Sequence, residues 1–407
     1  MRRPSKSPHP KLSTDSQRLI GFSHAIAQAS SRLEERAWER GLDTLSQKLL
    51  KSNHQDVIDT ALDNVFKADL DAYDSLVEAI EANSESCVIE QDGANFDALL
   101  IAAPILAWTR FAIPSGPIAE DIRQTLSAQL GAHLLADGAN LVVAPALFSI
   151  DQLPHTHAET FALTRRMAQA ALKNSVISIP AKATETVPFL ADTRYLLAIV
   201  VVPAGAPLFR WQMPQNQPNV IYDQLQVLSQ WQEQATPSIA RLLPGCGIEL
   251  LLPEAYYIAC READKQIRPA AIRAAQHYLT HTLNLEATEL RAIIGGFGDD
   301  SSDDQLSEYR IGFAIGTQPE IIYGIVWPLY GEEDDSDLSL QLDQKKPIEI
   351  ITALLQEEGI TNIKRHITRF PLEFCDDCGA PLFADDEGEL VHPEMPEDTP
   401  QGSEHFH

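Results

Sequence analysis

The sequence is poor in cysteine, in basic residues and in long hydrophobic runs, and each shortage excludes a class of protein. Its 407 residues include five cysteines, an odd and mostly scattered set that does not make a disulfide framework. The most hydrophobic run, residues 195–208, is interrupted by Pro203 and Pro207 and is shorter than the roughly 20 residues that cross a bilayer. The N-terminus lacks the apolar segment of a signal peptide. We therefore expect a cytoplasmic protein that does not bind membranes.

Basic side chains are outnumbered, since 31 Lys and Arg against 58 Asp and Glu give a formal net charge of −27. The acidic residues concentrate in residues 299–337 and 373–407, which hold eleven each. Nucleic-acid affinity comes largely from Lys and Arg that displace counterions, so this charge argues against nucleic acid as a partner. One alternative stays open, a nucleic-acid-binding arm among the basic residues of the extreme N-terminus, which are Arg2, Arg3, Lys6 and Lys11.

Residues 13–86 show the spacing of amphipathic helices, and residues 1–12 before them form a basic tail that we expect to be disordered. Apolar side chains recur mostly at intervals of three to five residues, as on a helix with one buried face. Ser13, Asn53 and Asp69 stand where an N-cap is needed, because their side chains can accept hydrogen bonds from the free N–H groups of a first turn. The pattern predicts a module of four helices.

From residue 87 onward the pattern changes to strands and helices in alternation. Residues 99–106 and 141–144 are continuous apolar runs, which indicates buried strands, and residues 118–135 between them have helical spacing with Pro117 in the first turn. Further elements continue the alternation: strands at 195–202, 208–211, 248–252, 290–294 and 363–370, a hairpin at 309–315 and 321–327, and helices at 158–173, 222–242, 269–283 and 348–357. We therefore predict an α/β or α+β body over residues 87–370.

The body also shows signs of internal duplication. Two segments align on Pro145 and Pro253, each at the end of an apolar strand and followed by an aromatic residue. Trp211 and Trp327 end hairpin arms that we interpret as equivalent. The periods of about 110 residues are too long for a solenoid repeat and fit duplicated α/β subdomains. The predicted sub-repeats, each built from strands, a hairpin or loop and helices, span residues 87–175, 176–285 and 286–370.

The strongest motif for chemistry is Cys375-Asp376-Asp377-Cys378-Gly379, within a zinc-knuckle-like segment at residues 371–395. The CxxC spacing lets a tight turn direct both sulfur atoms at one point, and the glycine lets backbone N–H groups approach the thiolates. A turn at Glu387-Gly388 lies between two short potential strands and brings His392 back toward the cysteines. We therefore predict a metal site of Cys375, Cys378 and His392, with zinc as the ion.

Other interpretations of the CxxC motif stay open. A zinc ribbon would offer a second cysteine pair, which this sequence lacks, so the motif is also compatible with a redox disulfide or with a relic that binds nothing. A tetrahedral zinc ion needs a fourth ligand beyond the three residues. It could come from Glu394, from His405 or His407, from water, or from a second chain. His405 and His407 lie in an acidic tail, residues 396–407, that we expect to be disordered.

The histidines give weaker signals. His155 and His157, with Glu159, have a spacing seen in metal hydrolases, which supports a metal-dependent hydrolase as an alternative function. The segment also follows a proline at a helix start, so Thr156 or His157 could simply cap that helix. No GxSxG, HExxH or GK[ST] motif occurs in the chain. We interpret residues 295–298, a glycine-rich run before a series of aspartates, as a flexible connection.

Three segments together resemble a family of uncharacterised bacterial proteins. They are STDSQRL at residues 13–19, SRLEERAWE at residues 31–39 and RFPLEFCDDCGAPL at residues 369–382. The resemblance spans the chain, and the family is described only as a domain of unknown function. It implies a bacterial, cytoplasmic protein and supplies no catalytic residues.

No complete catalytic set can be assembled from these motifs, and the acidic surface suits protein partners. We therefore expect a non-enzymatic cytoplasmic binding or regulatory protein with a C-terminal zinc knuckle, which binds a protein partner or forms a homo-oligomer. The metal-dependent hydrolase and the nucleic-acid-binding protein are the two alternatives.

Overall fold

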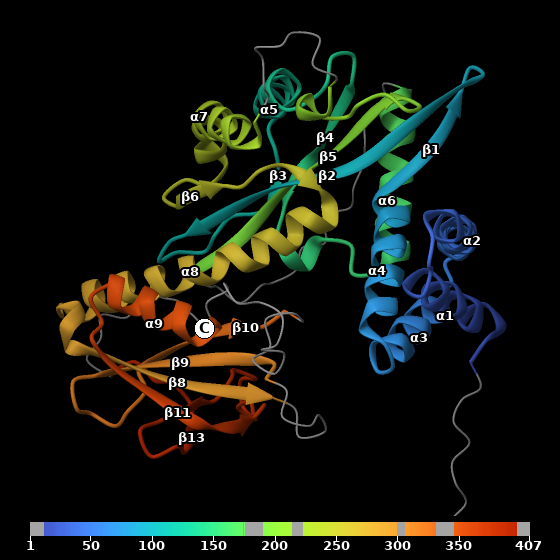
Figure 1. The fold of residues 1–407 in the computed structure, drawn as a ribbon. Helices are drawn as coiled ribbons and strands as arrows, with labels where there is room; N and C mark the ends of the chain where they lie inside the picture. Colours follow the sequence, from blue (N-terminus) through green and yellow to red (C-terminus); the bar gives the residue numbers. More distant parts are fainter. Residues whose placement is uncertain are drawn as a thin grey trace, which may run out of the picture.

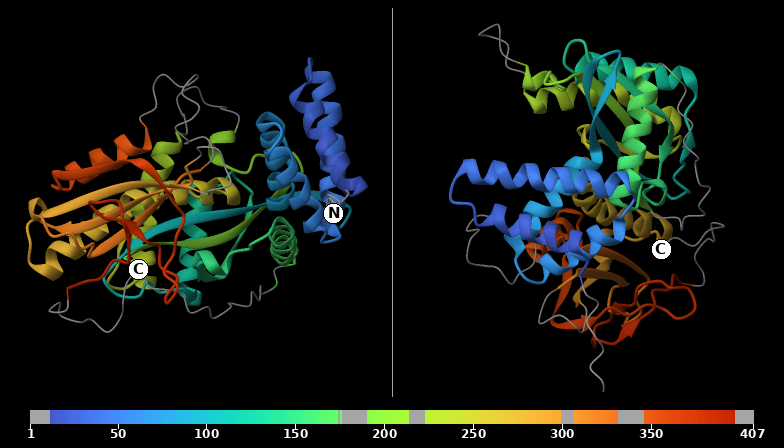
Figure 2. Two further views of the ribbon diagram at one scale, coloured as in Figure 1. Left: turned by 90° about the horizontal axis from the view of Figure 1, so that it is seen from below. Right: turned by 90° about the vertical axis from the view of Figure 1, so that its right-hand side faces the viewer.

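The computed structural model of the chain describes residues 12–173, 175, 190–213, 223–298, 306–330 and 346–396. They form a helical N-terminal module, a large sheet covered by helices on both faces, and a small sheet that carries the C-terminal segment (Figures 1 and 2). The predicted mixed α/β class with a helical N-terminus is confirmed. The predicted tails at residues 1–12 and 396–407 lie almost wholly outside the described residues, as do the acidic residues 299–305 and 331–345.

The helical module contains four helices, which are α1 (Thr14–Ala27), α2 (Arg32–Lys51), α3 (Gln55–Phe66) and α4 (Leu70–Glu85). Ser13 and Asp69 cap α1 and α4 as predicted, each accepting a hydrogen bond from a backbone N–H of the first turn. The prediction for Asn53 is wrong. Asn53 follows the end of α2 with a φ of 55°, a left-handed conformation that asparagine tolerates better than most residues, and His54 precedes α3 without a side-chain cap.

The large sheet is antiparallel and has the strand order β1-β2-β5-β4-β3, with β6 and β7 paired to the far part of β2. Its strands are β1 (Ser86–Gln91), β2 (Ala94–Trp108), β3 (Gly116–Pro117), β4 (Asn140–Phe148), β5 (Ala191–Pro203), β6 (Gly247–Leu250) and β7 (Glu254–Ala255). Strands from the first two predicted sub-repeats therefore lie in one sheet. The division of the chain into domains stays a prediction.

Helices cover both faces of the large sheet. One face packs against α5 (Glu120–His133) and α7 (Gln224–Leu242), and the other packs against α6 (His157–Leu172) and α8 (Tyr256–Leu283). Successive residues of β2, such as Ile105 and Leu106, point to opposite faces of the sheet and belong to different cores. Burial on both faces explains why β2 and β5 are continuous apolar runs although every pairing in this sheet is antiparallel.

Three sequence predictions for this region are wrong. Pro117 lies in β3, and α5 begins only at Glu120, because the chain first pairs with β4. Residues 208–211 are not a hairpin strand, since Phe209 makes one isolated bridge and residues 210–212 form a 3-10 turn. Trp211 therefore does not end a hairpin arm; its ring stacks on that of Phe209, with 4.6 Å between the ring centres. Further 3-10 turns lie at Ile150–Gln152 and Ala287–Glu289.

Helix α8 joins the two sheets and is much longer than predicted, since it begins at Tyr256 and passes through Pro269. Proline lacks an N–H, which frees the carbonyl of Lys265, and Arg268 Nε donates to that oxygen at 3.3 Å. Residues before the proline pack on the large sheet and residues after it pack on the small sheet. The Arg268 side chain thus replaces the backbone donor that proline lacks, and the helix continues past Pro269 from the large sheet to the small one (Figure 1).

The small sheet has the order β10-β9-β8-β11, with β11 parallel to β8 and the other pairs antiparallel. Its elements are β8 (Leu290–Gly298), β9 (Glu308–Ile315), β10 (Tyr323–Pro328), α9 (Pro347–Glu357) and β11 (Asn362–Pro371). We call residues 371–396 the C-terminal segment. One face of the small sheet packs against α8 and α9, and the other packs against Phe383, Ala384, Leu390 and Val391 of this segment. Residues 295–298 belong to the buried strand β8, so their interpretation as a flexible connection is wrong.

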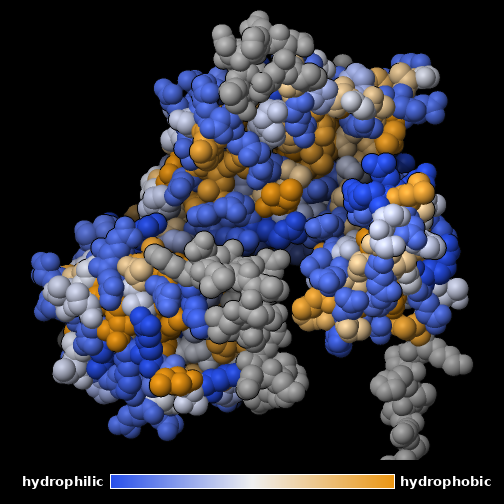
Figure 3. All heavy atoms as spheres, in the orientation of Figure 1, coloured by the Kyte–Doolittle hydropathy of each residue, from blue (hydrophilic) through white to orange (hydrophobic). Residues whose placement is uncertain are grey.

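Apolar side chains at the surface are scattered. On the face shown in Figure 3 they form several separate patches between hydrophilic regions. The most exposed ones of the helical module, Leu33 and Leu70, belong to different helices. None of the helices in the described ranges combines the length and hydropathy needed to span a membrane.

Candidate metal centre

The two cysteines lie in a tight loop, residues 373–382, whose arms are tied together by backbone hydrogen bonds. Leu382 N donates to the carbonyl of Glu373 at 3.1 Å, and Cys375 N donates to the carbonyl of Ala380 at 2.8 Å. Gly379 N then closes the turn onto the carbonyl of Cys375 at 2.8 Å. Gly379 has a φ of 73°, which explains the glycine at this position of the motif. Cys375 is half-buried and Cys378 is exposed.

A short hairpin after the loop brings the histidine to the cysteines. Strands β12 (Phe383–Ala384) and β13 (Leu390–Val391) pair antiparallel around the turn that contains Gly388. His392 follows β13 directly, and its Nε2 lies 3.2 Å from the Sγ atom of Cys378. The chain therefore turns at Glu387-Gly388 as predicted, and the turn brings His392 next to Cys378.

The ligand atoms of Cys375, Cys378 and His392 all lie within 4.8 Å of one another, so the group could hold a metal ion. The backbone N–H groups of Cys378 and Asp377 lower the pKa of the Cys375 thiol from its ordinary value, which favours the thiolate that a metal needs. On the other side of the imidazole, the Nδ1 atom of His392 lies 3.9 Å from a carboxylate oxygen of Glu394. In the part of the chain that the structure describes, no other cluster of three His, Cys, Asp or Glu ligands occurs.

The small sheet provides the base on which this group rests. The ring of Phe383 fits over Gly324 of β10 so closely that a Cβ on this glycine would lie 2.3 Å from it. Arg310 of β9 donates to two carbonyls of the cysteine loop, and Arg291 of β8 pairs with Asp386 in the hairpin turn at 2.6 Å. Neither arginine was predicted from the sequence as part of the site. The one signal for Arg310 is that it is the only basic residue between residues 299 and 337.

The histidines considered for a hydrolase do not form a metal-type cluster among the described residues. His155 is exposed, and its backbone N–H donates to Glu159. His157 lies at the start of α6, where its Nδ1 is 3.2 Å from the side-chain amide of Gln55. Burial lowers the pKa of His157, which favours the neutral ring. The helix cap is Thr156, whose hydroxyl accepts from the backbone N–H of Glu159.

The other cysteines lie apart from this group. Cys87 and Cys260 pack at the edge of the core between the large sheet, α6 and α8. Burial raises the pKa of Cys87 to about 11 and that of Cys260 to about 12, so both thiols stay protonated at neutral pH. Burial also raises the pKa of Cys246, which lies between two glycines. These three thiols therefore have environments that suit packing rather than metal binding.

Comparison with known protein families finds a match over residues 4–406, to a family described as "Protein of unknown function (DUF2863)". The comparisons with curated proteins and with solved structures found no match. The resemblance to a family of unknown function is thereby confirmed over almost the whole chain.

Proposed function

The chain belongs to the DUF2863 family of proteins of unknown function, and we propose that it binds zinc through Cys375, Cys378 and His392. The convergence of these three side chains carries the proposal, because it depends on two successive turns that return His392 to the cysteine loop. Two thiolates and an imidazole form a soft ligand set, which suits zinc and is unsuited to magnesium or calcium. A cytoplasmic location, where thiols stay reduced, is consistent with two free cysteines at the surface.

The role that we propose for the ion is structural, in a protein that acts by binding a protein partner rather than by catalysis. The loop and hairpin around the ligands lie over one face of the small sheet, so an ion that links Cys375 and Cys378 to His392 closes this cover. A fourth ligand would come from Glu394, from water, from a second chain, or from His405 or His407, which lie outside the described residues. A ligand from a second chain would make the ion part of a homo-oligomer interface.

Metal content of the purified protein tests the proposal. We expect up to one zinc ion per chain in the wild type and none in the Cys375→Ser, Cys378→Ser double variant. Cys246→Ser is the matched control, because it also removes a partly exposed thiol but leaves the proposed ligands intact. Equal zinc in wild type and double variant would contradict the proposal.

Two further measurements separate the possible sources of the remaining ligands. If His392 binds the ion within one chain, His392→Ala should lower zinc affinity while the mass in solution stays unchanged. If thiolate pairs from two chains share the ion instead, chelation should halve the mass measured by light scattering, and His392→Ala should leave zinc affinity unaffected.

A further inference from the structure

Arg310 is a buried charged residue at the base of the cysteine loop, residues 373–382. It lies in β9, and none of its side-chain surface is exposed. Its partner across the ladder in β8 is Gly295. A Cβ at Gly295 would lie 3.1 Å from the rings of both Phe297 and Phe370, so the absence of a side chain there leaves space for the layer above the sheet. The strand therefore holds a cation where most strands of a covered sheet hold an apolar residue.

The guanidinium is bonded to both arms of the cysteine loop. Its Nη1 donates to the carbonyl of Glu373 and to the carbonyl of Leu382, at 2.7 Å each. Its Cζ atom lies 4.3 Å from the ring centre of Phe297 and 5.0 Å from that of Phe374. Its Nε donates to the carboxylate of Glu308 at 2.6 Å. The loop is thus anchored at its base by a planar group that fits between two rings.

Two backbone hydrogen bonds connect this base with the first proposed ligand. Leu382 N donates to the same Glu373 carbonyl that Arg310 binds, and Cys375 N donates to the carbonyl of Ala380. These two bonds flank the pair of Phe374 and Pro381, which lie opposite each other in the two arms. A shift of the two arms at the base would therefore be passed on to Cys375.

We infer that Arg310 is a positioning residue of the metal site: it fixes the base of residues 373–382 so that both cysteines face His392, and it couples metal binding to the small sheet. The inference rests on the proposed function. Burial of a guanidinium is unfavourable in itself, and Nη2 has no hydrogen-bond partner in the described part of the chain. A gain in stability alone therefore explains this residue poorly, whereas the two bonds to the loop give it a geometric role.

The alternative is that Arg310 only holds the C-terminal segment against the sheet, as any buried contact would. Arg291 provides the matched comparison. Arg291 lies in β8, on the face of the small sheet that also carries Arg310, and 8% of its surface is exposed. It pairs with Asp386 and donates to the carbonyl of Gln318 at 2.6 Å, so it anchors the hairpin turn and makes no hydrogen bond to the cysteine loop among the described residues.

Cobalt(II) titration of the full-length protein separates the two roles, because thiolate-to-cobalt absorption bands report both affinity and geometry. We expect Arg310→Met to weaken cobalt binding by ~10- to 100-fold, the range for residues that orient metal ligands, and to alter the bands. Arg310→Lys keeps the charge but lacks the flat guanidinium that lies over the rings of Phe297 and Phe374, so we expect an intermediate loss. Arg291→Met should lower the midpoint of thermal unfolding and leave cobalt affinity and bands unchanged.

The outcomes are distinguishable. Wild-type affinity and bands in both Arg310 variants would overturn the inference and leave the proposed function standing. Equal loss of affinity in Arg291→Met and Arg310→Met would also overturn it, because docking alone would then explain the effect. If the wild type binds neither cobalt nor zinc, the proposed function fails and the inference fails with it.

Discussion

Replacing Glu85 with glutamine should stabilise the protein at pH 8 and leave its stability near pH 5 almost unchanged. Glu85 is the last residue of α4 and is 8% exposed. Its carboxylate accepts a hydrogen bond from the backbone N–H of Tyr257 at 2.9 Å, in the first turn of α8, where the preceding Ala255 has no side chain that can cap. The residue therefore links the helical module to the helix that joins both sheets.

The environment of Glu85 favours the protonated carboxyl group. Burial raises its pKa from the ordinary value of 4.5 to about 7; the Tyr257 N–H lowers it, nearby Glu81 raises it and Arg261 lowers it. The folded protein thus binds this proton more tightly than the unfolded chain. The resulting stability is fully present below pH 4.5 and is lost as the pH rises through 7. A shift of this size corresponds to about 3 kcal/mol between the two ends of that range.

Glutamine keeps the acceptor for the Tyr257 N–H and cannot ionise, so the variant lacks this penalty. Urea unfolding of both proteins at pH 5 and at pH 8 measures it, and the difference between variant and wild type should grow by about 2.5 kcal/mol over this interval. Glu78→Gln is the control. It removes an exposed carboxylate of the same helix, and we expect it to give no stabilisation at pH 8. An equal effect of Glu85→Gln at both pH values would refute the reasoning.

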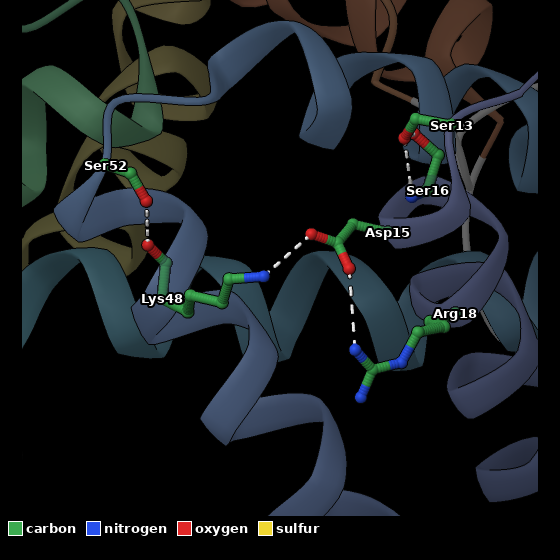
Figure 4. A network of polar contacts seen from close by, with 6 residues as sticks. All are labelled: Ser13, Asp15, Ser16, Arg18, Lys48 and Ser52. Atoms are coloured by element: carbon green, nitrogen blue, oxygen red, sulfur yellow. Dashed lines mark hydrogen bonds and ion pairs between the residues drawn. The ribbon is translucent and has the colours of Figure 1, made fainter.

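Two further predictions concern packing and capping. Gly324→Ala should destabilise the protein by about 1–3 kcal/mol and speed amide exchange in the C-terminal segment, because its Cβ would lie 2.3 Å from the ring of Phe383. Gly21→Ala, in α1 with nothing within 4 Å, should instead stabilise the protein by up to ~1 kcal/mol in urea unfolding, so equal effects would contradict this account. Ser13→Ala should cost about 1 kcal/mol, since it removes the 3.0 Å bond from Ser16 N (Figure 4), and Ser13→Asp should restore it; equal stability of all three would refute the cap.

Local signals in the sequence were sufficient for most elements. The caps at Ser13 and Asp69 act within one turn, and the apolar period of each helix is read over a few residues. The error at Asn53 is also local, because the same residue type favours an N-cap and a left-handed helix end. The start of α8 was missed because Pro269 was interpreted as a helix start, whereas the helix passes through it.

Errors in the sheets come from pairing between distant residues, which no short window shows. Residues 295–298 contain three glycines, a pattern that we interpreted as a loop. In β8 the side chains of Phe297 and Phe370 crowd Gly295, and Leu306 crowds Gly296, so larger residues would not fit there without a shift. The proposed metal ligands were found because they follow one another over a short stretch with a turn between them. Arg310 could not be found, since it lies 63 residues before Glu373, whose carbonyl it binds.

The contacts below Cys375, Cys378 and His392 indicate that the loop and hairpin that carry them are packed onto the small sheet. Gly312 and Gly324 lie opposite each other in β9 and β10, and the rings and methyl groups above them leave no room for larger side chains. Isolated zinc fingers have no such base, so they unfold when the ion leaves. Here Phe383 and Arg310 hold the loop and hairpin by contacts that do not involve the ligands. The three proposed ligand side chains therefore lie close together in the folded chain, so the proposed binding of an ion would require little further ordering of the chain.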